Sequence, residues 1–163
     1  MGTVRFQDLS ALSCGPVTDA IGENFNRKFK DASHVRWVKI KDTFQVRFYN
    51  QDEYCLAFFD ASGQLLMSGR KIQLDHVPQT VRKEMDRIRG ASEGKHDLLF
   101  VAGVYELNNS QGKRYFINLE SELLSMSLLV YGNGQSEIVK KINYLNGETV
   151  TSVLPSHFPG ACR

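Results

Sequence analysis

The side chains that most often carry out catalysis are scattered along this 163-residue chain. Its histidines show no HExxH motif and no cysteine–histidine group at zinc-binding spacing; they are His34, His76, His96 and His157. There is no GxSxG nucleophile motif, no P-loop, and no GxGxxG that opens a helix. We therefore predict no catalytic residue, no metal site and no cofactor, and we expect that the protein is not an enzyme.

Residues suited to binding gather instead in the stretch 43–49, TFQVRFY. Its apolar and polar residues alternate with a period of two, which is typical of a strand with one buried face. Phe44, Val46 and Phe48 would serve the core. The other face would then be open and would carry Gln45, Arg47 and Tyr49. Because arginine and tyrosine are frequent in binding hot spots, we predict a binding surface at these three residues.

Two further residues complete the predicted binding site. Trp37 stands on the preceding strand-like run, where the pattern allows it to face either the core or the open side. Asp52, next to Glu53, is expected at the tip of a hairpin. An adjacent pair of acids in a loop is also what a purely solvated turn contains, so the alternative is a turn without a role in binding.

The elements that would position these residues are a helix followed by four short strands. Apolar residues recur every fourth position from a start near Pro16, which predicts an amphipathic helix; they are Val17, Ile21, Phe25 and Phe29. Residues 33–73 contain four β-rich runs separated by short polar or glycine-containing breaks. Short breaks predict consecutive antiparallel hairpins, with the helix on one face of the sheet.

The second half of the chain repeats this order. A helix from Pro78 to about Gly90 carries the apolar stripe Val77, Val81, Met85 and Ile88, and four more strand-like runs follow. We therefore predict an α+β fold of two tandem units, each a helix plus a four-stranded antiparallel sheet. The predicted boundaries are a lead-in at 1–15, units at 16–76 and 77–145, and an irregular tail at 146–163.

Charge and cysteine content narrow the functional class. A net charge of +2 argues against a nucleic-acid binder, which usually has a basic excess. No apolar run is long enough to cross a membrane, and the chain as given shows no signal peptide. Cys55 is expected in the core, whereas a disulfide between Cys14 and Cys162 is left open.

The order of the runs ASHVRW, FQVRFYN and LAFFDASGQLL, followed by a Val-Pro pair that begins a helix, resembles the bacterial PepSY-like proteins. The resemblance covers about 16–90 and extends to the second half only by architecture; it is carried by Trp37, Phe44, Phe48, Phe59, Asp60 and Gly63. It implies the fold of the β-lactamase inhibitor protein (BLIP), in which tandem units form one curved sheet surface. It also implies a periplasmic or secreted location. No partner-contacting residue of the inhibitor can be carried over by motif.

Together these observations predict a non-enzymatic binding module of the cell envelope whose partner is a protein or peptide. The prediction includes the case in which the module inhibits that partner. The alternative is a carrier or sensor that binds a small ligand in the groove between sheet and helices. A groove filled by Phe25, Phe29 and Phe58 would argue against that alternative.

Overall fold

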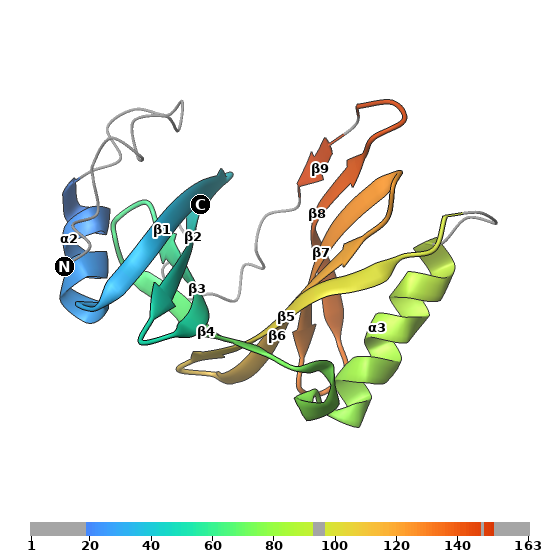
Figure 1. Cartoon of the computed structure of the whole chain (residues 1–163), viewed down its shortest axis with the longest axis horizontal. Helices are drawn as coiled ribbons and strands as arrows, with labels where there is room; N and C mark the ends of the chain where they lie inside the picture. Colours follow the sequence, from blue (N-terminus) through green and yellow to red (C-terminus); the bar gives the residue numbers. More distant parts are fainter. Residues whose placement is uncertain (1–18, 93–96, 148, 152–163) are drawn as a thin grey trace. The chain divides into compact units, whose positions relative to one another are not determined.

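The computed structural model describes residues 19–92, 97–147 and 149–151 of the chain. The expected lead-in at 1–15, the helix start near Pro16, and Cys14 and Cys162 lie outside the described residues. The described part is an α+β fold with antiparallel strands, as predicted (Figure 1). It divides into two compact units, the first ending at Arg70 and the second beginning at Lys71.

The first unit consists of helix α2 (Asp19–Lys28), strands β1 (Ala32–Ile40), β2 (Thr43–Asn50) and β3 (Glu53–Asp60), and most of β4 (Leu65–Ile72), whose last two residues belong to the second unit (Figure 1). Ile21 and Phe25 of the predicted helical stripe are buried on α2, and Phe29 follows the helix and packs against the same core. The Phe25 ring contacts the rings of Phe29, Trp37, Phe48 and Phe59 at centroid distances of 5.3, 5.3, 5.0 and 6.2 Å. An aromatic cluster therefore fills the space between this helix and its strands.

A tight turn joins β3 to β4 and also touches α2. Gly63 adopts a positive φ of 89° in this turn, and its carbonyl oxygen accepts a hydrogen bond of 2.8 Å from Asn24 Nδ2. Asp60 Oδ1 accepts hydrogen bonds from Ser62 and from the backbone N–H of Gln64. A Cβ at Gly63 would lie 3.1 Å from the backbone of Ala20, so the position requires glycine for space as well as for φ.

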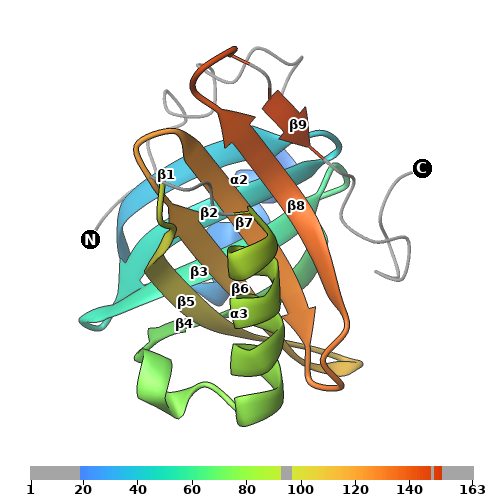
Figure 2. The same cartoon turned by 90° about the vertical axis from the view of Figure 1, so that its right-hand side faces the viewer.

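The second unit contains the short 3₁₀ helix η1 (Leu74–His76), helix α3 (Gln79–Ser92) and strands β5 (Phe100–Asn109), β6 (Gly112–Glu120), β7 (Leu124–Tyr131), β8 (Ser136–Asn143) and β9 (Thr149–Thr151). Figure 2 shows α3 lying across strands of this unit. The predicted stripe is confirmed, because Val77, Val81, Met85 and Ile88 are all buried in one core with residues of β5, β6 and β7. This core is mainly aliphatic.

The prediction of a four-stranded sheet in each unit is not matched. The described strands form one sheet whose order follows the sequence from β1 to β9. Part of the tail that was expected to be irregular also belongs to the sheet, because Thr149–Thr151 form strand β9 and pair with β8.

The described helices include none that is both long enough and apolar enough to cross a membrane.

Candidate functional site

Strand β2 separates its side chains between two faces as its sequence indicates. Phe44, Val46 and Phe48 belong to the core beneath α2. Gln45, Arg47 and Tyr49 lie on the opposite face, beside β1 and β3. That face is less open than predicted, because Gln45 is only 4% exposed and Leu56 and Phe58 of β3 are fully buried. Its accessible part is around Arg47 and Tyr49.

Two arginines meet on this face. Arg36 of β1 is the direct cross-strand partner of Arg47 of β2. Cross-strand neighbours have Cβ atoms about 4.5–5.5 Å apart, and like charges placed in this way are destabilising. Among the ion pairs between described residues, none joins Arg36 or Arg47 to an acid. The two positive charges therefore repel each other and remain available to a negatively charged partner that approaches this face of the sheet.

The buried amide of Gln45 orients Arg47. In the orientation that satisfies both groups, its oxygen accepts hydrogen bonds from Arg47 Nε at 2.9 Å and Nη2 at 3.3 Å. These bonds hold one side of the guanidinium against the sheet. The end that carries Nη1, and the second hydrogen of Nη2, remain as donors. Gln45 is thus a positioning residue rather than part of an open surface.

Aromatic rings adjoin the arginines at the β2–β3 end of the face. Tyr49 is 42% exposed, and its ring centroid lies 4.9 Å from that of its cross-strand partner Tyr54. His34 contacts Tyr49 edge-on at 5.7 Å, from a bulge in β1 where the His34 φ is 52°. We call Arg36, Arg47, Tyr49 and Tyr54 the arginine–tyrosine patch.

Sequence reasoning found half of this patch. Arg36 was missed because its strand run carries a bulge between Ser33 and Arg36, which shifts the period-two pattern. Tyr54 was missed because it begins a run that is otherwise apolar. The signal that could have found both is register: an Asn50–Glu53 pair closing the hairpin sets Tyr49 opposite Tyr54.

Trp37 is not part of the binding face. Its side chain is 7% exposed and lies in the core, with ring centroids 5.3 Å from Phe25 and 5.8 Å from Phe59. Its indole Nε1 has no hydrogen-bond partner among the described residues. The placement of Trp37 in the binding site is therefore corrected, because β1 parity puts it on the same side as Phe44 and Val46.

Asp52 lies at the tip of the β2–β3 hairpin, as predicted, and is exposed. Gln51 and Asp52 both have positive φ, 48° and 68°, which is the backbone of a tight hairpin turn whose twist matches the flanking strands. Its conformation is explained by the turn alone. It stands beside Glu53, whose Oε1 accepts a hydrogen bond of 2.6 Å from Arg70.

The corresponding face of the second unit has a different character. Arg114 of β6 lies directly opposite Tyr131 of β7, and its guanidinium carbon is 4.5 Å from the centre of the tyrosine ring. The Tyr131 hydroxyl donates a hydrogen bond of 3.3 Å to Glu137 Oε1. Burial, together with the nearby negative charge of Glu137, raises the pKa of Tyr131 to about 12. This arginine therefore already has an aromatic partner within the chain.

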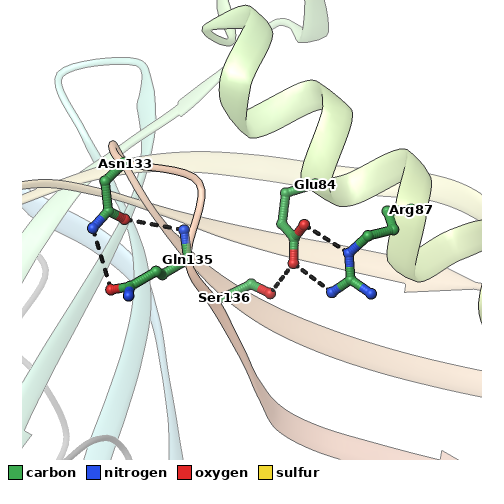
Figure 3. A network of polar contacts seen from close by, with 5 residues as sticks. All are labelled: Glu84, Arg87, Asn133, Gln135 and Ser136. Atoms are coloured by element: carbon green, nitrogen blue, oxygen red, sulfur yellow. Dashed lines mark hydrogen bonds and ion pairs between the residues drawn. The ribbon is translucent and has the colours of Figure 1, made fainter.

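A second polar cluster connects α3 to β8 (Figure 3). Glu84 accepts hydrogen bonds from Arg87 at 2.6 and 2.8 Å and from Ser136 Oγ at 2.5 Å. These hydrogen bonds lower the pKa of Glu84 to about 2. Because every oxygen of this carboxylate is engaged by a neighbour, we assign the cluster a structural role. The nearby contacts between Asn133 and Gln135 form the β7–β8 turn (Figure 3).

Neither a metal site nor a reactive thiol is found in the described parts of the chain. No cluster of three or more potential metal ligands occurs there. Cys55 is buried in the first core as expected, and its burial raises the pKa of its thiol. A raised pKa keeps the thiol protonated and poorly nucleophilic.

Comparison by sequence found no family model and no curated protein that matches this chain. Comparison of structures found several Bacteroides proteins. One is a putative periplasmic protein from Bacteroides eggerthii, with 18% identity over 82% of this chain and 93% of that one, and a TM-score of 0.50. Others are a BLIP-like protein from Bacteroides fragilis (16%, 91% and 97%, TM-score 0.46) and a DUF2874 family protein from Bacteroides uniformis (17%, 77% and 88%, TM-score 0.47). The likeness to the first of these shows a shared fold.

Proposed function

We propose that this protein is a non-enzymatic binding module that recognises a protein or peptide through the arginine–tyrosine patch. The observation that carries the proposal is the cross-strand pair of Arg36 and Arg47, which has no acidic partner among the described residues. A pair of like charges lowers the stability of the sheet, so its presence has no structural benefit. A partner that supplies the missing contacts provides that benefit on binding.

The composition of the patch fits a protein partner. Arginine and tyrosine are among the residues that contribute most to binding energy at protein interfaces. Tyr49 and Tyr54 contact one another with tilted rings, and Arg47 is held by Gln45. Residues that are already ordered lose less conformational freedom on binding, which favours affinity.

We place this module in the cell envelope, in the periplasm or outside the cell. Two observations support the location: the resemblance of its first half to the PepSY-like proteins, and a structural neighbour described as a putative periplasmic protein. An inhibitory action on an enzyme is included in the proposal. We also infer that the two helix-and-strand units are tandem repeats, since Gly63 and Gly134 occupy the same turn with φ of 89° and 88°.

The alternative, a small ligand held between sheet and helix, has less support in the first unit. Phe25 and Phe29 fill the space beneath α2 together with Phe48, Phe59 and Trp37. Phe58, expected to join them, lies on the other face of β3, opposite Gln45. We expect no thermal shift with lipid, haem or hydrophobic dye.

The test uses the whole chain as bait in an envelope extract, followed by hydrogen exchange with the purified partner. We expect the partner to protect amides of β1, β2 and β3, and the variant Arg47→Ala/Tyr49→Ala to lose both capture and protection. The matched control, Arg82→Ala/Tyr144→Ala, removes one exposed arginine and one exposed tyrosine from the second unit. Protection that falls elsewhere, or capture that survives the first variant, would overturn the proposal.

A further inference from the structure

We infer that the ligand of the arginine–tyrosine patch is an acidic polypeptide segment whose carboxylates bind Arg36 and Arg47. The inference rests on the proposed function and names the chemical class of its partner. It requires that the patch has donors free to bind carboxylates, that its surroundings favour a short acidic segment over a long polyanion, and that its aromatic part suits a polypeptide.

The donors of the patch match carboxylate geometry. A guanidinium presents pairs of parallel N–H groups that bind both oxygens of a carboxylate. Gln45 occupies the Nε side of Arg47, so the bidentate position that remains is the end with Nη1 and Nη2. A carboxylate bound there would lie above the sheet, within reach of the exposed Arg36 on the neighbouring strand.

The two arginines should contribute unequally. Arg47 is half-buried, whereas Arg36 is exposed. Exposed ion pairs are screened by water and salt and stabilise little, while a partly buried, hydrogen-bonded guanidinium is screened less. Arg47 should therefore provide most of the affinity, and Arg36 should add to it and sharpen the preference for a second negative charge.

The surroundings disfavour a long polyanion such as a nucleic acid. The patch offers two guanidiniums, and binding to nucleic acid normally depends on many phosphate contacts. Asp52 stands at the adjacent hairpin tip, where it would repel a chain of phosphates running along the strands. The net charge of the whole protein is only +2. A short segment with locally concentrated acids avoids this repulsion.

The tyrosines favour a polypeptide over a free anion. Tyr49 and Tyr54 present ring surface beside the charges, and such rings pack against backbone and aliphatic side-chain groups. In an extended segment, acids at alternate positions point to the same side and are about 6–7 Å apart. A segment of this pattern can place one carboxylate on each arginine while its backbone crosses the tyrosines.

The experiment measures binding of a short fluorescent peptide of alternating glutamate and small polar residues to the full chain, by anisotropy. Two control ligands are measured in the same way: the same peptide with glutamine in place of glutamate, and a fluorescent single-stranded oligonucleotide. We expect the acidic peptide to bind at least about tenfold more tightly than either. The variant Arg36→Ala/Arg47→Ala should lose about tenfold or more in affinity, and Arg47→Ala alone should lose more than Arg36→Ala.

Two matched variants separate charge from geometry. Lys39→Ala removes a positive charge from the same strand, but on the core side, where Lys39 lies over the Phe44 ring; we expect unchanged binding. Arg36→Lys/Arg47→Lys keeps the charge and removes the paired donors, and we expect an intermediate loss. Circular dichroism and urea denaturation confirm that each variant is folded.

Equal binding of the acidic and glutamine peptides, no binding of the acidic peptide, or tighter binding of the oligonucleotide would overturn the inference. The proposed function fails by a different result, namely a captured partner whose hydrogen-exchange protection avoids β1, β2 and β3. If protection falls on those strands while the peptides show no preference for acid, the binding surface stands and the acidic partner does not.

Discussion

In the first unit, the arginines on the sheet face opposite the helix have no acidic partner among the described residues, whereas the arginine on the corresponding face of the second unit lies over a tyrosine ring. Arg36 is paired across the strands with Arg47, and Arg114 is paired in the same way with Tyr131. The same kind of cross-strand position is thus repulsive in one unit and attractive in the other. The fold can accommodate a stabilising pair at such a position, as Arg114 and Tyr131 show. The fold alone therefore does not require the repulsive pair of Arg36 and Arg47.

The two cores differ as well. The core beneath α2 is built largely from aromatic rings around Phe25, while the core beneath α3 is mainly aliphatic, around Val81 and Met85. Aromatic rings pack by preferred edge-to-face contacts, whereas aliphatic side chains interlock by shape alone. The first unit should therefore be more sensitive to the loss of one central side chain.

The largest effect is expected for Phe25→Ala. Phe25 is fully buried and contacts four other aromatic rings, so its removal should lower the free energy of unfolding by about 3–5 kcal/mol. Met85→Ala in the second unit should lower it by about 2–3 kcal/mol, since a flexible side chain leaves a cavity that neighbours fill more easily. Urea denaturation measures both, and a larger loss for Met85→Ala would reverse the comparison of the cores.

The next effect compares the same turn in both units. Gly63→Ala should destabilise by about 2–3 kcal/mol, because the new Cβ would adopt an unfavourable φ and also press on the Ala20 backbone at 3.1 Å. Gly134 has nearly the same φ but no atom within 4 Å of its Cβ position, so Gly134→Ala should cost only about 1 kcal/mol. Equal losses in thermal or urea denaturation would show that φ alone matters and that the contact with α2 does not.

A smaller effect tests the two arginine environments directly. Arg114→Ala removes the contact with the Tyr131 ring and should destabilise by about 1 kcal/mol. Arg36→Ala relieves repulsion, and we expect no loss, or a gain of about 0.2–0.5 kcal/mol. Urea midpoints at low and high salt should show the Arg36→Ala gain shrinking as salt screens the charges. A clear loss of stability in Arg36→Ala would mean that its charge has a structural partner.

A further effect of about the same size depends on pH. Glu84 has a pKa of about 2 in the folded chain against an ordinary 4.5, so its charged form stabilises the fold above about pH 4.5, and this contribution is lost as pH falls toward 2. Glu84→Gln should therefore destabilise by about 1 kcal/mol at pH 7 and by almost nothing near pH 2. Glu53→Gln in the first unit, which breaks a more exposed pair with Arg70, should have a smaller effect. Urea denaturation across this pH range distinguishes them.

The periodic parts of the fold could be predicted from the sequence. The helical stripe from Val77 to Ile88 and the alternation from Phe44 to Phe48 predict which apolar side chains belong to the core, and both are seen in the structure. The periodicity of the sequence does not predict how many strands a sheet contains, because backbone pairing between strands does not depend on the side-chain pattern. For this reason the four-stranded sheet expected in each unit is not matched, and the described strands follow one order from β1 to β9.

The candidate site was predicted in part for a related reason. Arg47 and Tyr49 follow from the parity of one strand, whereas Arg36 and Tyr54 depend on the register between strands and on the bulge before Arg36. The burial of Gln45 could not be predicted from its own strand. It depends on hydrogen bonds to Arg47 and on the buried residues of β3 on the same face of the sheet. Trp37 was ambiguous in the sequence for the same lack of register.

The order of the strands has a consequence for how the chain folds. Within each unit every strand pairs with the strand that precedes or follows it in the sequence, through short connections. Such pairings close small loops and carry little entropic penalty before native contacts form. Proteins dominated by contacts between residues near in sequence fold faster than those that depend on distant pairings. Each hairpin can therefore form early and serve as the template for the next strand, which shortens the time for which unpaired strand edges are exposed.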